Sequence, residues 1–77
     1  MRISKNDIKE LVDVLHETLD REIYEKGYFT IITKNGIIIT GREYAITTEE
    51  NGTWIEIKTG DKLTAVKMNI KNIGIVA

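Results

Sequence analysis

Asn69, Lys71 and Asn72 are the side chains best suited to molecular recognition, because they gather in the segment 69–72 beside a predicted tight turn. An Asn amide can read the edge of a nucleobase, and a Lys ammonium can neutralise a phosphate. A polar turn selected only for its backbone geometry would use the same residue types. The sequence leaves both interpretations open.

Three further side chains could stack on nucleobases, namely Arg42, Tyr44 and Trp54. Aromatic rings and the planar guanidinium group are the usual platforms for unpaired bases. Trp54 directly precedes Ile55 in a predicted strand, so burial in a core or an interface is the main alternative for its ring.

Catalysis and metal binding have little support in the sequence. The single histidine, His16, falls at the margin of a helical apolar stripe, and no Ser or Cys is spaced to act with it. Glu49, Glu50, Glu56 and Asp61 could pair for acid–base chemistry, but most lie in predicted turns, where solvated charge is typical. There is no Cys and no phosphate-binding or metal-binding motif. We therefore expect a non-enzymatic protein with no catalytic residue, metal or cofactor.

Composition and charge narrow the class of protein. The chain has 77 residues, with 11 basic and 12 acidic side chains, so binding of nucleic acid by bulk positive charge is excluded. It lacks the apolar core of a signal peptide and any long apolar run. We expect one domain spanning 1–77, located in the cytoplasm and not in a membrane.

An amphipathic helix is predicted over about 5–26. Ser4 is a suitable N-cap, with Asp7 three residues later as a short capping box, and Gly27 supplies the stop. Apolar side chains recur between them at steps of three and four residues, at Ile8, Leu11, Val12, Leu15, Leu19 and Ile23.

After Gly27 the apolar period changes to two, and short links predict a five-stranded antiparallel meander over about 28–77. Asn35-Gly36 and Asn51-Gly52 are hairpin signals in which both turn positions are expected to have positive φ. Further turns are expected at 59–61 and 71–72. In the first hairpin the expected inward set is Phe29, Ile31, Ile37 and Ile39, with Ile32 and Ile38 outside.

The strands are apolar on both faces, which is more than a small monomer can bury. At about 25 cal/mol per Å² of apolar area, leaving several such side chains in water would cost several kcal/mol. The predicted fold class is α+β, mainly β, with an N-terminal helix followed by a strongly bent sheet that curls into a small barrel. We expect copies to associate at strand edges.

The segment TKNGIIITGRE resembles the first signature of Sm-like proteins, the family that includes bacterial Hfq. In that family Asn-Gly or Asp-Gly is followed by four residues and then by a Gly in a bent second strand, here Asn35, Gly36 and Gly41. The segment MNIKNIGIVA lies where the second signature would be. An N-terminal helix before five strands is also the family's order of elements.

The resemblance implies a small SH3/Sm-like barrel whose copies form a ring, with a hexamer as one option. Such a ring would contact single-stranded RNA through repeated weak sites. Asn69, Lys71, Asn72, Arg42, Tyr44 and Trp54 are the binding candidates, and Asn35, Gly36, Gly41, Asn51 and Gly52 are the expected turn and bend residues. An alternative is a small oligomeric barrel from a phage or mobile element. That protein would bind a host protein or sequester a small anionic nucleotide.

Overall fold

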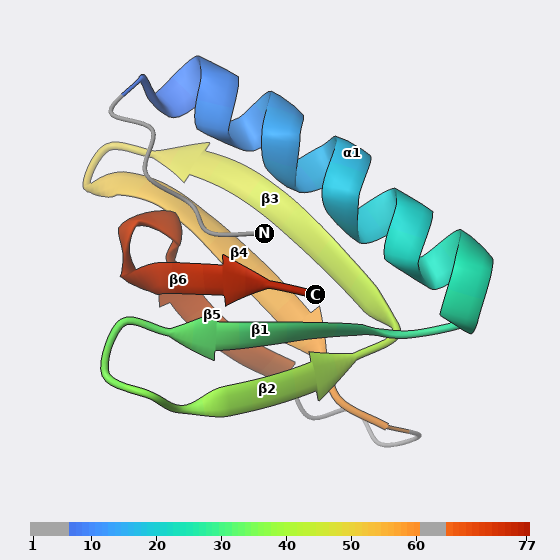
Figure 1. Ribbon diagram of the computed structural model, residues 1–77. Helices are drawn as coiled ribbons and strands as arrows, with labels where there is room; N and C mark the ends of the chain where they lie inside the picture. Colours follow the sequence, from blue (N-terminus) through green and yellow to red (C-terminus); the bar gives the residue numbers. More distant parts are fainter. Residues whose placement is uncertain (1–6, 61–64) are drawn as a thin grey trace.

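A computed structural model describes residues 7–60 and 65–77 and has an α+β fold with mainly β content (Figure 1). Within these residues one helix precedes six strand segments, and a 3-10 turn, η1, links the last two. The elements are α1 (Ile8–Lys26), β1 (Phe29–Thr33), β2 (Ile38–Gly41), β3 (Glu43–Glu49), β4 (Gly52–Lys58), β5 (Ala65–Asn69), η1 (Ile70–Asn72) and β6 (Ile73–Val76).

Helix α1 begins at Ile8, later than the predicted start at residue 5. Asp7 has an extended backbone, and its carboxylate accepts hydrogen bonds from the backbone N–H groups of Lys9 and Glu10. It is therefore the N-cap, because it satisfies donors that have no partner within the helix. Ser4, the predicted N-cap, lies outside the described residues. The predicted stop is confirmed, since Gly27 has φ of 85° and its N–H donates to the Ile23 carbonyl.

The turn between β1 and β2 differs from the predicted two-residue turn. Only Gly36 has positive φ (88°), whereas Asn35 does not. The Gly36 N–H donates to the Thr33 carbonyl, and the Thr33 N–H donates to the Ile37 carbonyl. This is the pattern of a three-residue loop in which a β-turn is followed by one left-handed residue. The loop is formed by residues 34–36, and Ile37 follows it, just before the start of β2.

The loop between β3 and β4 also lies one residue earlier than predicted. Glu49 pairs with Gly52, so Glu50 and Asn51 form the connection, and Gly52 is the first residue of β4. Asn51 lacks positive φ, while Gly52 has φ of 134°. After β4, Gly60 has φ of 85° within the predicted turn at 59–61. Asp61 and the predicted strand residues 62–64 lie outside the described residues.

The strand predicted over 37–48 divides at Arg42, and this break separates two antiparallel sheets. The first has the order β2-β1-β6 and the second the order β3-β4-β5. Gly41 ends β2 where side chains crowd the backbone: an added Cβ would lie 2.5 Å from Ile57 Cγ2 and 3.0 Å from the Lys58 carbonyl oxygen. Among the described residues no strand pairing joins the two sheets, so they are not closed into a barrel.

The core lies between the two sheets and is covered by the apolar stripe of α1, which runs alongside β3 (Figure 1). Phe29 and Ile31 point inward as predicted and are fully buried, and Ile39 packs against the core. Ile37, just before β2, is 55% exposed and does not pack against the core, in contrast to the prediction. The buried apolar residues are Leu11, Leu15, Leu19, Phe29, Ile31, Ile55, Ile57, Met68, Ile70, Ile73 and Val76.

Candidate functional site

The outer face of the second sheet brings Trp54 next to Asn69. Thr53, Ile55 and Ile57 of β4 are buried, so the alternation of the strand turns Trp54 to the opposite face. Antiparallel pairing then sets Trp54 directly across from Asn69 on β5 and from Thr47 on β3. Two predicted binding residues that are far apart in the sequence thus become cross-strand neighbours.

The Trp54 indole makes a hydrogen bond at its edge and a cation–π contact on one face. Its Nε1–H donates a hydrogen bond of 3.0 Å to Oδ1 of Asn51 in the preceding loop. The ammonium group of Lys67 lies 5.5 Å from the ring centroid, within the range of a cation–π interaction. The side chain is half-buried. A planar ligand that stacks on this ring would therefore meet a preorganised aromatic surface next to a positive charge.

Lys67 is in turn paired with Glu49. Its Nζ lies 2.9 Å from Oε1 and 3.3 Å from Oε2 of that carboxylate, which belongs to the end of β3. The hydrogen bond to Glu49, with the negative charges of Glu49 and Glu56, raises the pKa of Lys67 above its ordinary value. The cation above Trp54 is thus engaged by a carboxylate of the same surface.

Asn69 lies on this face, across from Trp54, and Lys71 follows it in η1. The Asn69 Oδ1 accepts a hydrogen bond of 2.9 Å from the Lys71 backbone N–H and so caps the 3-10 turn. The Lys71 side chain is exposed. A Cβ at Gly52 would lie 2.9 Å from Asn69 Nδ2, so the glycine leaves room for the amide at the edge of the sheet. We define the recognition face as Asn51, Trp54, Lys67, Asn69 and Lys71.

Tyr44 faces away from the recognition face. It pairs with the buried Ile57, and its ring packs edge-on against Phe29 with centroids 5.8 Å apart. Its hydroxyl lies 2.7 Å from Oδ1 of Asp20 and 2.8 Å from Nδ1 of His16, both in α1. Burial and the hydrogen bond to Asp20 raise the pKa of Tyr44. The structure therefore places Tyr44, with His16, in the contact between helix and sheet.

Arg42 is also separated from the recognition face. It lies at the break between β2 and β3, where its backbone N–H donates to the Lys58 carbonyl at the far end of β4 from Trp54. It lines a shallow hollow of about 300 Å³ with Tyr28, Thr40, Gly41 and Gly60. The structure does not bring Arg42 together with Lys71.

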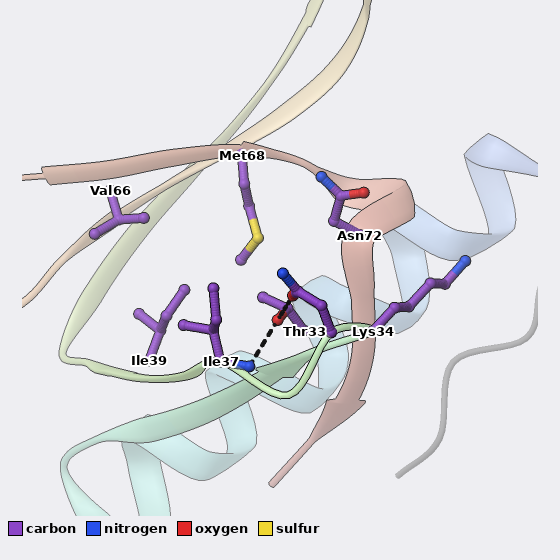
Figure 2. A pocket seen from close by; sticks show the side chains of 8 residues that line it. Thr33, Lys34, Ile37, Ile39, Val66, Met68 and Asn72 are labelled. Atoms are coloured by element: carbon purple, nitrogen blue, oxygen red, sulfur yellow. Dashed lines mark hydrogen bonds between the residues drawn. The ribbon is translucent and has the colours of Figure 1, made fainter.

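An apolar groove of about 550 Å³ lies between the first hairpin and β5 (Figure 2). Val66 and Met68 point from β5 toward Ile37 and Ile39, while Lys34 points away (Figure 2). Asn72 stands at the rim, and its carbonyl accepts a hydrogen bond from the Lys34 N–H. Thr33 and Asn35 complete the lining. Asn72 thus belongs to the groove, next to the recognition face.

A second apolar feature crosses the outer face of the first sheet. Ile32 on β1 pairs with Ile38 on β2 and with Ile75 on β6. Ile38 is 67% exposed, and the other two are half-buried. We call these three side chains the isoleucine row. The predicted outward orientation of Ile32 and Ile38 is confirmed.

Sequence reasoning missed Lys67 and Glu49 as parts of the site. A signal was present for Lys67, because it lies two residues before Asn69 and strand residues two apart share a face. Glu49 carries no such signal, since its position beside Lys67 depends on the register of three strands.

No metal or membrane feature accompanies the site in the part of the chain that the structure describes. Residues 7–60 and 65–77 contain no group of three or more His, Asp or Glu side chains that could hold a metal ion. Within the same ranges no helix is long and apolar enough to cross a bilayer. Comparison of the chain with protein-family models, curated proteins and solved structures finds no match.

Proposed function

We propose that this protein is a non-enzymatic, Sm-like RNA-binding protein that contacts single-stranded RNA through the recognition face. The observation that carries the proposal is the pairing of Trp54 with Asn69 across β4 and β5, with Lys71 on the turn that follows. An aromatic ring, an amide and a cation are the side chains that recognise an unpaired nucleotide. No cofactor is needed for this function.

Two features of the fold support the proposed Sm-like barrel. The chain passes from β2 to β3 through a bend at Gly41 and Arg42, so two consecutive strands belong to different sheets. The last strand, β6, returns to pair with β1, so the bend joins the edge strand β2 of the sheet β6-β1-β2 to the edge strand β3 of the sheet β3-β4-β5. Two sheets joined in this way would close into the proposed barrel if their other edge strands, β5 and β6, also came together.

The apolar surfaces support association between copies. The groove beside β5 and the isoleucine row leave apolar area in water that a second copy would cover. In a closed ring of six copies each recognition face would offer one weak site for a nucleotide. Linking the sites through one RNA strand would then multiply their affinities. We expect such a ring to act in the cytoplasm.

The binding mechanism follows from the chemistry of the three side chains. A base would stack on Trp54, which is worth about 1–3 kcal/mol per base in proteins that bind single strands. The Asn69 amide would contact the edge of the base, and Lys71 would contact a phosphate. Because the net charge of the chain is only −1, affinity is expected to be modest and to fall with added salt.

The test uses the single Trp of the chain as its probe. Titration with oligouridine and oligoadenosine at low salt should quench Trp54 fluorescence, because a stacked base lies on the ring. Lys71→Ala should weaken binding about threefold to tenfold without loss of folding, since one phosphate contact is removed. Lys9→Ala, at an exposed position on α1, is the charge-matched control and should bind as the wild type does.

Binding of neither oligonucleotide at micromolar protein would refute the proposed function. Equal affinity of Lys71→Ala and the wild type would remove the η1 turn from the site.

A second candidate function is favoured by the groove. A groove with Val66, Met68, Ile37 and Ile39 on its walls, beside the sheet-edge strand β5, suits an extended apolar segment of another protein. That other protein would be a host protein, and this chain would be a small barrel from a phage or mobile element that binds it. Recovery of a specific partner from lysate by the wild type but not by Val66→Asp would favour it. A thermal shift with nucleotides alone would instead indicate a small anionic ligand.

A further inference from the structure

We propose that Glu49 is a built-in competitor of RNA phosphate, which holds Lys67 above Trp54 until a nucleotide displaces it. This inference rests on the proposed function and concerns the regulation of the same site. It assigns Glu49 and Lys67 a role in affinity that neither the turn at 69–72 nor the resemblance to Sm-like proteins supplies.

The geometry links three side chains from three neighbouring strands. Lys67 extends from β5, contacts both carboxylate oxygens of Glu49 on β3, and places its ammonium over the ring of Trp54 on β4. The salt bridge therefore crosses β4 beside the indole. A base that stacks on the same side of the ring must share that space with Lys67 or displace it.

The pair is exposed enough to exchange partners. The side chains of Lys67 and Glu49 retain 45% and 42% of their accessible surface. A salt bridge at such a surface is weak, and a phosphate is an alternative anion for the same ammonium group. When Lys67 turns to a phosphate, Glu49 is left as a free carboxylate near the bound strand. The carboxylate thus opposes binding in two ways, by retaining the cation and by repelling the anion.

The first test compares Glu49→Gln with the wild type in the oligouridine titration. Loss of the carboxylate should tighten binding about twofold to fivefold, because Lys67 no longer has to break an ion pair. The salt dependence should steepen, since on a single strand log K falls by about 0.7 per neutralised phosphate for each tenfold rise in salt concentration. Glu43→Gln is the matched control. This substitution removes one negative charge from the same face of the sheet, as Glu49→Gln does. Glu43, however, pairs with Lys58 at the far end of the sheet, where Oε2 of Glu43 lies 3.5 Å from Nζ of Lys58.

The second test separates release of Lys67 from simple repulsion. In a Lys67→Met background, which keeps an apolar stem beside Trp54, the Glu49→Gln substitution should give a clearly smaller gain in affinity, because only the repulsion of the phosphate is then removed. A gain of the same size without Lys67 would show that Glu49 acts only through its charge, and it would overturn the inference. Equal affinities of Glu49→Gln, Glu43→Gln and the wild type would also overturn it.

These outcomes differ from failure of the proposed function. If the wild type binds oligouridine and the Glu49 variant behaves like it, only the competitor role is lost. If no variant binds, the recognition face and its regulation are both refuted.

Discussion

The hydroxyl of Tyr44 in β3 lies 2.7 Å from Oδ1 of Asp20 in α1, to which it donates its proton. The hydroxyl oxygen of Tyr44 also lies 2.8 Å from Nδ1 of His16. Because the hydroxyl proton is already donated to Asp20, the His16 nitrogen must be the donor in this second hydrogen bond. These contacts join the helix to the second sheet at a polar point beside the core. They explain why a tyrosine, and not a phenylalanine, packs against Phe29.

Tyr44→Phe should lower the free energy of unfolding by about 1 kcal/mol, because it removes a hydrogen bond to a charged carboxylate at a partly exposed site. The ring packing against Phe29 would be kept. Urea denaturation measures the change, with Tyr24→Phe as the control, since Tyr24 is 90% exposed and should have no effect. Equal losses in the two variants would contradict a role for the helix contact.

The contribution of Tyr44 should disappear at alkaline pH. Its pKa is raised in the folded protein above the ordinary value of 10.0, so the folded state holds this proton more tightly than the unfolded chain does. The stabilisation is then fully present below about pH 10 and is lost as the pH rises above that value. The difference in unfolding free energy between the wild type and Tyr44→Phe should therefore shrink as the pH rises from about 10 toward the raised pKa of the folded protein. A constant difference over this range would show that the hydroxyl proton does not matter.

Local signals predicted the helix and the first two hairpins, but not the break at Arg42 that divides the strand predicted over 37–48. The apolar stripe and Gly27 predicted α1, and the Asn-Gly pairs located both hairpins. The predicted helix start and the predicted first turn were wrong because a competing local interaction determines each of them. The capping hydrogen bonds of Asp7 make Ile8 the first residue of the helix. The first hairpin adopts a loop that needs positive φ only at Gly36. The sequence pattern alone does not distinguish these alternatives.

Cross-strand neighbours were less predictable because they depend on register. A turn centred on Asn51-Gly52 would pair Trp54 with Glu49, whereas the observed loop pairs it with Thr47. A shift of one residue in the loop moves the partner by two residues and so keeps the face of the sheet while changing the contacts. The faces of Trp54 and Asn69 thus follow from alternation, but the ion pair between Lys67 and Glu49 does not.

Gly41→Ala should destabilise the fold by about 2 kcal/mol, since overpacking a tight site commonly costs about 1–3 kcal/mol. The new Cβ would lie 2.5 Å from Ile57 Cγ2 and 3.0 Å from Phe29 Cζ, both on buried side chains. Thr40→Ala, at the exposed neighbouring position, should change stability by less than about 0.5 kcal/mol. Thermal or urea unfolding gives both values. Ordinary stability for Gly41→Ala would show that the bend can open to accept a side chain.

Ile38→Lys tests whether the isoleucine row is an interface between copies. Ile38 is 67% exposed, so its replacement should change the stability of an isolated copy by less than about 0.5 kcal/mol. A charge placed beside Ile32 and Ile75 in a contact between copies would instead be buried without a partner, which is costly. We therefore expect the mass measured by light scattering to fall from that of an oligomer toward that of one chain. Ala45→Lys adds the same charge at an exposed position of the second sheet and should leave the mass unchanged.

If the wild type is already a single chain at high concentration, association through this row and the proposed ring are both wrong. If Ile38→Lys stays oligomeric, the copies are joined elsewhere, and the groove beside β5 becomes the surface to test with Val66→Asp.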